Sequence, residues 1–223
     1  MRFYQLFTAL AASTTVMAAS SLRCSPFPSS MIEFSSGFVQ PEPPLVKPEF
    51  KTNFVQHKWY FSLSTFPFHA DRTKRNENLS HITTGFIDNS PSKGFVRADE
   101  AFDGKVASSL FNYANVTKSG LVDNTLTTYT PGSSKPEVWR GYVNSNFPIF
   151  QKDILVKGGA VFEGLVQRKF IPAPVAAWSL MYQDAIPVTV YVDNCHVVVG
   201  YDYFSPGLRT RVINEFFNTE AKE

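Results

Sequence analysis

Cysteine, long apolar runs and blocks of like charge are all scarce in this 223-residue sequence. The 21 basic and 19 acidic side chains leave a formal charge of +2, and the densest basic stretch, Arg72–Arg75, holds three cations. Proteins that bind nucleic acids or anionic membranes usually carry such cations in clusters, so the sequence predicts neither partner. Beyond Ala18 no apolar stretch is long enough to cross a bilayer, and we expect no transmembrane segment in the mature chain.

Motifs for catalysis and for metal binding are also lacking. The 4 histidines are isolated, and no His-x-x-x-His, Cys-x-x-Cys or acidic cluster occurs, so we expect no metal site and no cofactor. There is no Gly-x-Ser-x-Gly elbow, and Gly158-Gly159 lacks the Lys-Ser/Thr of a phosphate loop. Asp99 and Glu100 leave opposite faces of an expected strand, which disfavours an acid–base pair. These absences favour a binding protein that is not an enzyme.

The N-terminus has the features of a secretory signal peptide. Arg2 supplies a positive charge, a run of apolar and small residues covers Phe3–Val16, and Val16-Met17-Ala18 has the small-x-small form that signal peptidase cleaves. We therefore assign residues 1–18 to a signal peptide and expect a secreted, extracellular protein.

The segment that follows, residues 19–48, is rich in Ser and Pro and is expected to be an extended leader. It contains Cys24, and the only other cysteine is Cys195. An oxidising compartment favours a disulfide between these two, although the position of Cys24 in the leader could equally keep them apart. Two sequons predict glycosylation at Asn78 and Asn115.

From Glu49 onward the pattern is that of successive strands with polar turns between them. Val188, Val190 and Val192, for example, share one face of a strand. Many antiparallel neighbours joined by tight turns predict a mainly β fold, a strongly curved antiparallel sheet. The expected strands are Glu49–Trp59, His81–Ile87, Gly94–Phe102, Lys105–Tyr113, Gly120–Tyr129, Val138–Val143, Val161–Ile171, Ala177–Gln183, Val188–Val192 and His196–Tyr203.

Three stretches do not fit this pattern. Phe147–Val156 could form a helical turn or two, and Leu208–Asn218 has apolar residues at helical spacing but could also be a last strand. Residues 60–77 form an irregular insertion with no clean period. This insertion is either a genuine surface loop or the translation of an unspliced intron, since Trp59-Tyr60 can be encoded with a donor-like GTAC and Ala70-Asp71 with a branch-point-like CTGAC.

Several short motifs carry a resemblance to a known group. They are Pro48-x-Phe50-x-x-x-Phe54, Lys93-Gly94-Phe95-Val96-Arg97-Ala98-Asp99, Val161-Phe162-Glu163-Gly164, Ala177-Trp178-Ser179-Leu180-Met181-Tyr182, Pro187-Val188-Thr189-Val190-Tyr191-Val192-Asp193 and Val198-Val199-Gly200-Tyr201-Asp202-Tyr203. From Pro48 to Asn218 the sequence resembles the ependymin-related and LolA-like secreted proteins. This resemblance implies one half-barrel domain over residues 49–218, with one or two helices plugging its open side and an apolar pocket between sheet and plug.

The resemblance also implies a function, because the pocket of the bacterial relatives holds acyl chains. Ependymin-type members usually carry several cysteines in the domain, whereas the domain of this sequence contains only Cys195. Their disulfide pattern and any calcium or matrix role are therefore not carried over. The group has no shared catalytic residues to transfer.

Aromatic residues are abundant, with 21 Phe, 9 Tyr and 3 Trp. They line apolar pockets but also fill ordinary β cores. We therefore expect a secreted, non-enzymatic binder of a lipid or other apolar small molecule; the alternative is a surface or wall-associated interaction protein without a ligand cavity. A small-barrel enzyme would need His81, Glu163 or Asp202 to converge inside a cavity. The expected pocket residues are Phe86, Phe102, Trp139, Phe162, Trp178 and Tyr182.

Overall fold

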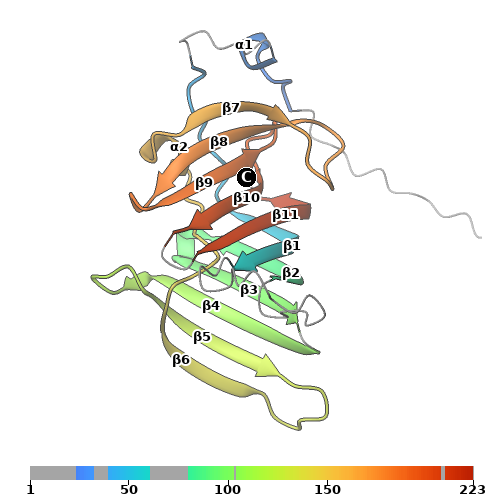
Figure 1. Cartoon of the computed structure of the whole chain (residues 1–223), viewed down its shortest axis with the longest axis vertical. Helices are drawn as coiled ribbons and strands as arrows, with labels where there is room; N and C mark the ends of the chain where they lie inside the picture. The colour runs from blue at the N-terminus through green and yellow to red at the C-terminus, as the bar shows by residue number, and fades with distance from the viewer. Residues whose placement is uncertain (1–23, 33–39, 61–79, 103, 207–208, 223) are drawn as a thin grey trace, which may run out of the picture.

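The fold is a single antiparallel sheet of 11 strands that curves into an open half-barrel (Figure 1). The computed structural model describes residues 24–32, 40–60, 80–102, 104–206 and 209–222. The predicted signal peptide, the sequon residue Asn78 and residues 61–77 of the predicted insertion lie outside these ranges. Within them, the mainly β, strongly curved antiparallel sheet that the sequence predicts is confirmed.

The elements follow one another along the chain as two meanders. The strands are β1 (Phe50–Tyr60), β2 (Ser80–Ser90), β3 (Phe95–Phe102), β4 (Lys105–Val116), β5 (Val122–Tyr129), β6 (Glu137–Val143), β7 (Val161–Val166), β8 (Val175–Tyr182), β9 (Ile186–Val192), β10 (Val198–Ser205) and β11 (Thr210–Ala221). The described helices are one turn each, α1 (Ser29–Ile32) and α2 (Ile154–Lys157), with a 3-10 turn at Pro91–Lys93.

The first and last strands pair in the middle of the sheet. The strand order is β6-β5-β4-β3-β2-β1-β11-β10-β9-β8-β7, so β1 and β11 join a wing made of β1–β6 to a wing made of β7–β11. Their register places Phe54 opposite Phe216 and Gln56 opposite Asn214. These four side chains are buried on the concave face, where Gln56 Nε2 donates to Asn214 Oδ1 at 3.0 Å.

The C-terminal stretch, for which the sequence left helix and strand open, is strand β11. Thr210, Val212, Asn214 and Phe216 are buried at every second position, which is strand periodicity. Backbone pairing with β1 on one side and β10 on the other favours this choice over a helix. The predicted strand Val161–Ile171 is shorter in the structure, since β7 ends at Val166.

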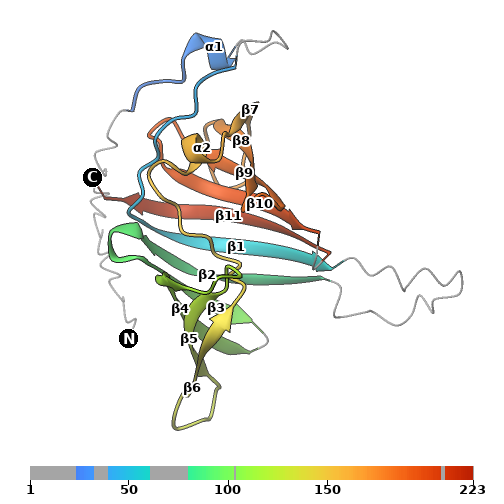
Figure 2. The same ribbon diagram turned by 90° about the vertical axis from the view of Figure 1, so that its left-hand side faces the viewer.

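A crossing segment, residues 144–160, connects β6 to β7 over the concave face (Figure 2). It contains the single helical turn α2, which overlaps the predicted Phe147–Val156 and ends one residue beyond it, and we call this segment the plug. Its Phe147, Phe150 and Leu155 are buried. Phe147 packs edge-on against Phe54 at 5.3 Å between ring centroids, and Phe150 packs against Tyr201 at 5.4 Å. Burial of each such side chain contributes about 2–3 kcal/mol, so the plug and the sheet share one core.

Asn89 of β2 binds the backbone of two other segments at once. Its Nδ2 donates to Pro48 O at 2.6 Å and to Phe150 O at 3.1 Å, while its Oδ1 accepts from Phe150 N at 3.1 Å. The side chain is buried. A buried amide that satisfies three backbone contacts fixes the end of the leader and the plug relative to the sheet.

The described part of the leader lies against the domain. Val46 is buried, and its N–H donates to Lys152 O of the plug at 2.9 Å. Lys47 N donates to His196 O at 2.7 Å, next to an isolated parallel bridge between Lys47 and Val197.

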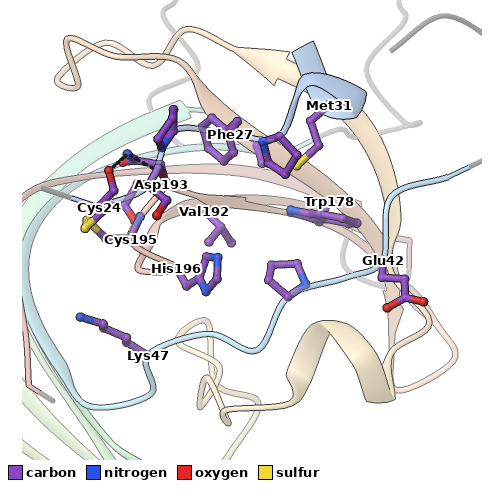
Figure 3. A pocket seen from close by; sticks show the side chains of 16 residues that line it. Cys24, Phe27, Met31, Glu42, Lys47, Trp178, Val192, Asp193, Cys195 and His196 are labelled. Atoms are coloured by element: carbon purple, nitrogen blue, oxygen red, sulfur yellow. Dashed lines mark hydrogen bonds between the residues drawn. A yellow bond between two sulfur atoms is a disulfide. The ribbon is translucent and has the colours of Figure 1, made fainter. Parts of the chain in front are cut away.

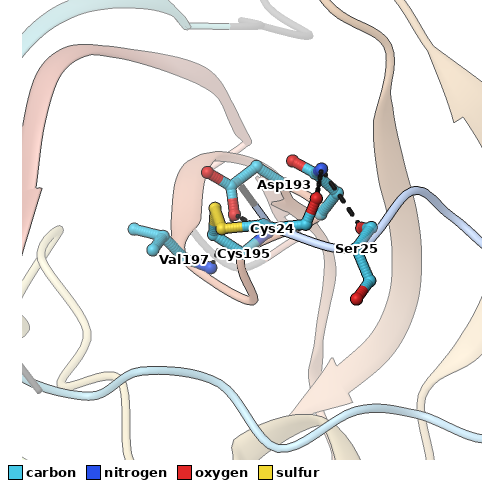
Figure 4. Close-up of a disulfide and its surroundings, with 6 residues drawn as sticks. Cys24, Ser25, Asp193, Cys195 and Val197 are labelled. Atoms are coloured by element: carbon cyan, nitrogen blue, oxygen red, sulfur yellow. Dashed lines mark hydrogen bonds between the residues drawn. A yellow bond between two sulfur atoms is a disulfide. The ribbon is translucent and has the colours of Figure 1, made fainter. Parts of the chain in front are cut away.

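A disulfide joins the start of the described leader to the turn between β9 and β10 (Figure 4). It links Cys24 to Cys195, whose Cα atoms are 5.1 Å apart. Asn194 Nδ2 donates to Ser25 O at 3.2 Å, and Asp193 Oδ1 accepts from Cys195 N and Val197 N at 2.9 and 2.8 Å. The turn is therefore shaped by its own aspartate before the disulfide attaches the leader to it.

Removal of this disulfide should destabilise the protein and loosen the leader. Because the bond closes a separation of 171 residues, Cys195→Ser is expected to lower the free energy of unfolding by about 2–5 kcal/mol. Calorimetry measures the loss, and limited proteolysis should newly cut within residues 24–32, the part of the leader that the disulfide attaches. Cys24→Ser and the double variant should lose the same amount, since all three remove one bond. A double variant that loses twice as much as either single variant would contradict a native disulfide.

Candidate functional site

A cleft opens between the plug and the strands β8, β9 and β10. Its outer part has a volume of about 440 Å³, and a narrow inner part adds about 50 Å³. Both parts are lined by five of the same residues, so they adjoin one another, and together we call them the plug cleft. These shared residues are Ser145, Asn146, Tyr182, Ile186 and Tyr203.

Strand alternation explains which side chains reach the cleft. Leu180 and Tyr182 of β8 share the concave face with Val188 and Val190 of β9, two residues apart in each strand. The β8–β9 register pairs Tyr182 with Ile186 at the end of the hairpin, which places both side chains at the boundary between the inner and outer parts.

The two ends of the plug cleft differ in polarity. The inner end is closed by aliphatic and aromatic side chains, including Phe150, Leu180 and Val190. The outer end opens among polar groups contributed by β1, the plug, the β8–β9 turn and the ends of β10 and β11. These polar residues are Lys58, Asn144, Gln183, Ser205 and Thr210.

Three tyrosine hydroxyls hold the plug beside the cleft. Tyr113 donates to Phe147 O at 2.5 Å, and Tyr201 donates to Asn146 O at 2.6 Å. Tyr203, stacked on Tyr201, donates to Asn146 Oδ1 at 3.0 Å. Burial raises the pKa of the Tyr113 and Tyr201 phenols. Neutral tyrosines therefore act as hydrogen-bond donors to the plug and as apolar walls of the cleft.

A second space, which we call the leader pocket, lies between the leader and the concave side of β8 and β9 (Figure 3). Its volume is about 470 Å³. Phe27 and Met31 come from the leader around α1, while Trp178 and Val192 come from the sheet. The leader pocket and the plug cleft share no lining residue.

The six aromatic residues predicted to form one pocket are not gathered together. Tyr182 lines the plug cleft, and Trp178 lines the leader pocket with Phe162 packed on its indole at 5.2 Å. Trp139 is 49% exposed on the edge strand β6. Phe86 lies on the convex face, opposite to the buried Ile87. Phe102 ends β3, and its side chain is outside the described residues.

Most of the residues that line the plug cleft and the leader pocket were not predicted from the sequence. Tyr203 continues the alternation of the buried Tyr201, so the period of β10 could have indicated it. Asn146, Phe27 and Met31 have no such signal, because they come from segments without strand periodicity.

Acidic residues considered for catalysis lie away from the plug cleft. Asp202 points to the convex face, where Arg168 contacts it at 3.3 Å and Tyr191 OH donates to it at 2.9 Å. Burial raises the pKa of Asp202 despite the Arg168 guanidinium. Glu163 is exposed on β7, and the side chain of His81 is outside the described residues.

Asn115 of the second sequon is exposed, and its Nδ2 donates to Asp123.

The described residues contain neither a cluster of metal ligands nor a helix that could span a membrane. No group of three or more His, Cys, Asp or Glu side chains among them is arranged to hold a metal ion. No helix in the same part of the chain is long and apolar enough to cross a membrane.

Comparisons with known proteins show little similarity. No protein-family model matches the sequence, and no curated protein matches it. Among solved structures that resemble the fold is the crystal structure of a DUF1329 family protein from Desulfovibrio piger, with a TM-score of 0.31 and 10% sequence identity. The match covers 79% of this chain and 86% of the other.

Replacement of the plug-binding hydroxyls should reduce stability in a graded way. Tyr201→Phe is expected to lower the free energy of unfolding by about 1–3 kcal/mol, because the half-buried backbone carbonyl of Asn146 loses its donor. Tyr113→Phe should cost about 1 kcal/mol, since Phe147 O also accepts from Ser145 Oγ at 3.0 Å. Urea unfolding measures both. The control Tyr142→Phe removes an exposed hydroxyl and should change stability by less than about 0.5 kcal/mol. An equal loss in Tyr142→Phe and Tyr201→Phe would count against this role.

Stability should also fall at alkaline pH. Burial raises the pKa of Tyr113, Tyr182 and Tyr201, whereas tyrosines in the unfolded chain ionise near pH 10, at about their ordinary pKa. Above that pH the unfolded chain binds fewer protons than the native protein, so the free energy of unfolding decreases as the pH rises. Tyrosinate absorbance at 295 nm should show a late, cooperative step that coincides with loss of the β signal in circular dichroism. Smooth ionisation of all tyrosines in the folded protein would refute the expectation.

Proposed function

We propose that the protein is a secreted, non-enzymatic binder of a lipid or another apolar ligand, held in the plug cleft. The observation that carries this proposal is the cleft's division into an apolar inner end and a polar mouth. Its volume, about 440 Å³ in the outer part, lies within the range of roughly 300–1,000 Å³ typical of small-molecule sites.

The division of polarity suits an amphipathic molecule. The end of an alkyl chain would replace water beside Leu180, Val188 and Val190 in the narrow inner part, where each buried methylene gains about 0.8 kcal/mol. A polar head would remain at the mouth near Lys58 and Gln183, which line the outer part. The plug is already hydrogen-bonded to the sheet, so a ligand would not need to order it on binding.

Other observations favour this proposal over the alternatives. A surface interaction protein does not require a cavity, so that alternative leaves a cleft of this size unexplained. The enzyme alternative required His81, Glu163 or Asp202 to converge inside a cavity, whereas Glu163 and Asp202 both lie outside the plug cleft. Secretion is supported by the signal-like N-terminus and by the disulfide, since disulfides persist in oxidising compartments.

A matched pair of tryptophan substitutions tests the site. Ile186→Trp places a large ring in the cleft, while Ile82→Trp alters an isoleucine that is 60% exposed on β2. The secreted protein should enhance the fluorescence of 11-(dansylamino)undecanoic acid. Ile186→Trp should weaken its affinity by about tenfold or more, equivalent to about 1.4 kcal/mol, and Ile82→Trp should leave it unchanged.

Two further results decide the outcome. Native mass spectrometry of protein purified from its natural source should reveal a bound apolar molecule that lipid extraction removes. The proposal fails if no such molecule co-purifies and the dansyl probe is not taken up. It also fails if both tryptophan variants bind the probe as the original protein does, because the probe would then lie outside the plug cleft.

A further inference from the structure

The leader pocket is built from segments that are far apart in the sequence. Phe27 and Met31 of the leader face Trp178 of β8 and Val192 of β9 across it, and Pro44 adds a further apolar wall (Figure 3). At about 470 Å³ it is as large as the outer part of the plug cleft. Its walls are thus mainly apolar, and its size fits a molecule of about two fused rings or more.

Trp178 brings a polar atom to these apolar walls. The side chain is 0% exposed, and its indole Nε1 has no hydrogen-bond partner among the described residues. In Figure 3 this nitrogen is at the end of the ring that faces the interior of the pocket, toward Val192 and His196. Buried donors without a partner are rare in proteins because their desolvation is not compensated. No protein group among the described residues accepts from this donor, and because Nε1 is covered, the oxygen of a water or of a bound molecule would reach it only by displacing neighbouring side chains.

The orientation of the indole is fixed by its neighbours. Phe162 packs against it at 5.2 Å between ring centroids, and strand β8 pairs on both sides, with β7 and with β9. The position of Nε1 is therefore set before any ligand arrives, which lowers the entropic cost of forming the bond.

Charges of both signs surround the pocket and do not select for a charged ligand. Lys47 lines it together with Glu42 and Asp193. The Asp193 carboxylate already accepts two backbone N–H groups, from Cys195 and Val197. A net charge on the ligand would thus meet like as well as opposite charges.

We infer that the leader pocket is a second binding site, for a neutral, largely apolar molecule whose carbonyl or similar oxygen accepts a hydrogen bond from Trp178 Nε1. This site is distinct from the plug cleft and does not rest on the function proposed there. The leader forms its cover, held at one end by the disulfide to Cys195 and at the other by the hydrogen bonds of Val46 and Lys47.

Two naphthalenes of similar shape test the role of the acceptor. 2-Acetylnaphthalene has a carbonyl group, and 2-isopropenylnaphthalene has a methylene in place of its oxygen. The ketone should bind the oxidised, full-length secreted protein about fivefold more tightly than the alkene, the preference expected of one hydrogen bond. In ¹⁵N-labelled protein, the ketone should move the indole proton signal of Trp178 downfield, while Trp59 and Trp139 signals stay in place.

Substitutions separate this site from the other. Trp178→Phe keeps an aromatic ring without the N–H and should abolish the preference for the ketone, whereas Trp139→Phe, on the edge strand β6, should keep it. Ile186→Trp in the plug cleft should also keep it, so failure of one site can be distinguished from failure of the other.

Equal affinity of the original protein for the two naphthalenes would overturn the inference. So would an unchanged Trp178 signal at saturating ketone, a result that is decisive even if Trp178→Phe does not fold. A preference for the ketone that survives in folded Trp178→Phe would place the acceptor contact elsewhere and would also overturn it.

Discussion

The structure depends on one requirement: the backbone of an irregular segment must be hydrogen-bonded where it crosses an apolar concave face. Unlike a helix, the plug cannot satisfy most of its own N–H and C=O groups. Asn89 supplies a donor and an acceptor to Phe150, and the hydroxyls of Tyr113 and Tyr201 supply donors to Phe147 and Asn146. With these partners in place, the phenylalanines of the plug can be buried without leaving its nearby backbone N–H and C=O groups unpaired.

The path of the plug also explains where the plug cleft and the leader pocket lie. The plug covers the central strands, and its aromatic side chains fill the space beside Phe50, Phe54 and Phe216. Toward β8 and β9 the plug and the leader run on separate paths and leave the plug cleft and the leader pocket between them and the sheet. Buried phenylalanines such as Phe54 and Phe216 thus form the core, whereas Phe150 and Phe27 also line the plug cleft and the leader pocket.

Alternation of apolar and polar residues made the sheet predictable, and its limits explain what was missed. The two-residue period of a strand identifies β9 from Val188, Val190 and Val192. It does not predict which face of the sheet is concave, and for this reason Phe86 was grouped with Tyr182. Apolar residues at 212, 213, 216 and 217 satisfy both helical and strand spacing, and only pairing with β1 and β10 resolves the choice. The leader contacts are non-local: Val46 contacts Lys152, and Cys24 is bonded to Cys195, a pairing that the sequence suggested only because it contains two cysteines. No local pattern encodes such contacts.

The central pairing of β1 with β11 has a consequence for how the chain is made. Phe50 lies opposite Ala221, so a ribosome must synthesise nearly the entire domain before β1 acquires its second neighbour. Until then β1 presents an unpaired edge, to which another chain could add a strand. Contacts of such long sequence separation also slow folding. The two wings can each assemble as local hairpins, but the half-barrel closes only when the last strand emerges, so C-terminal truncation would leave two separate sheets.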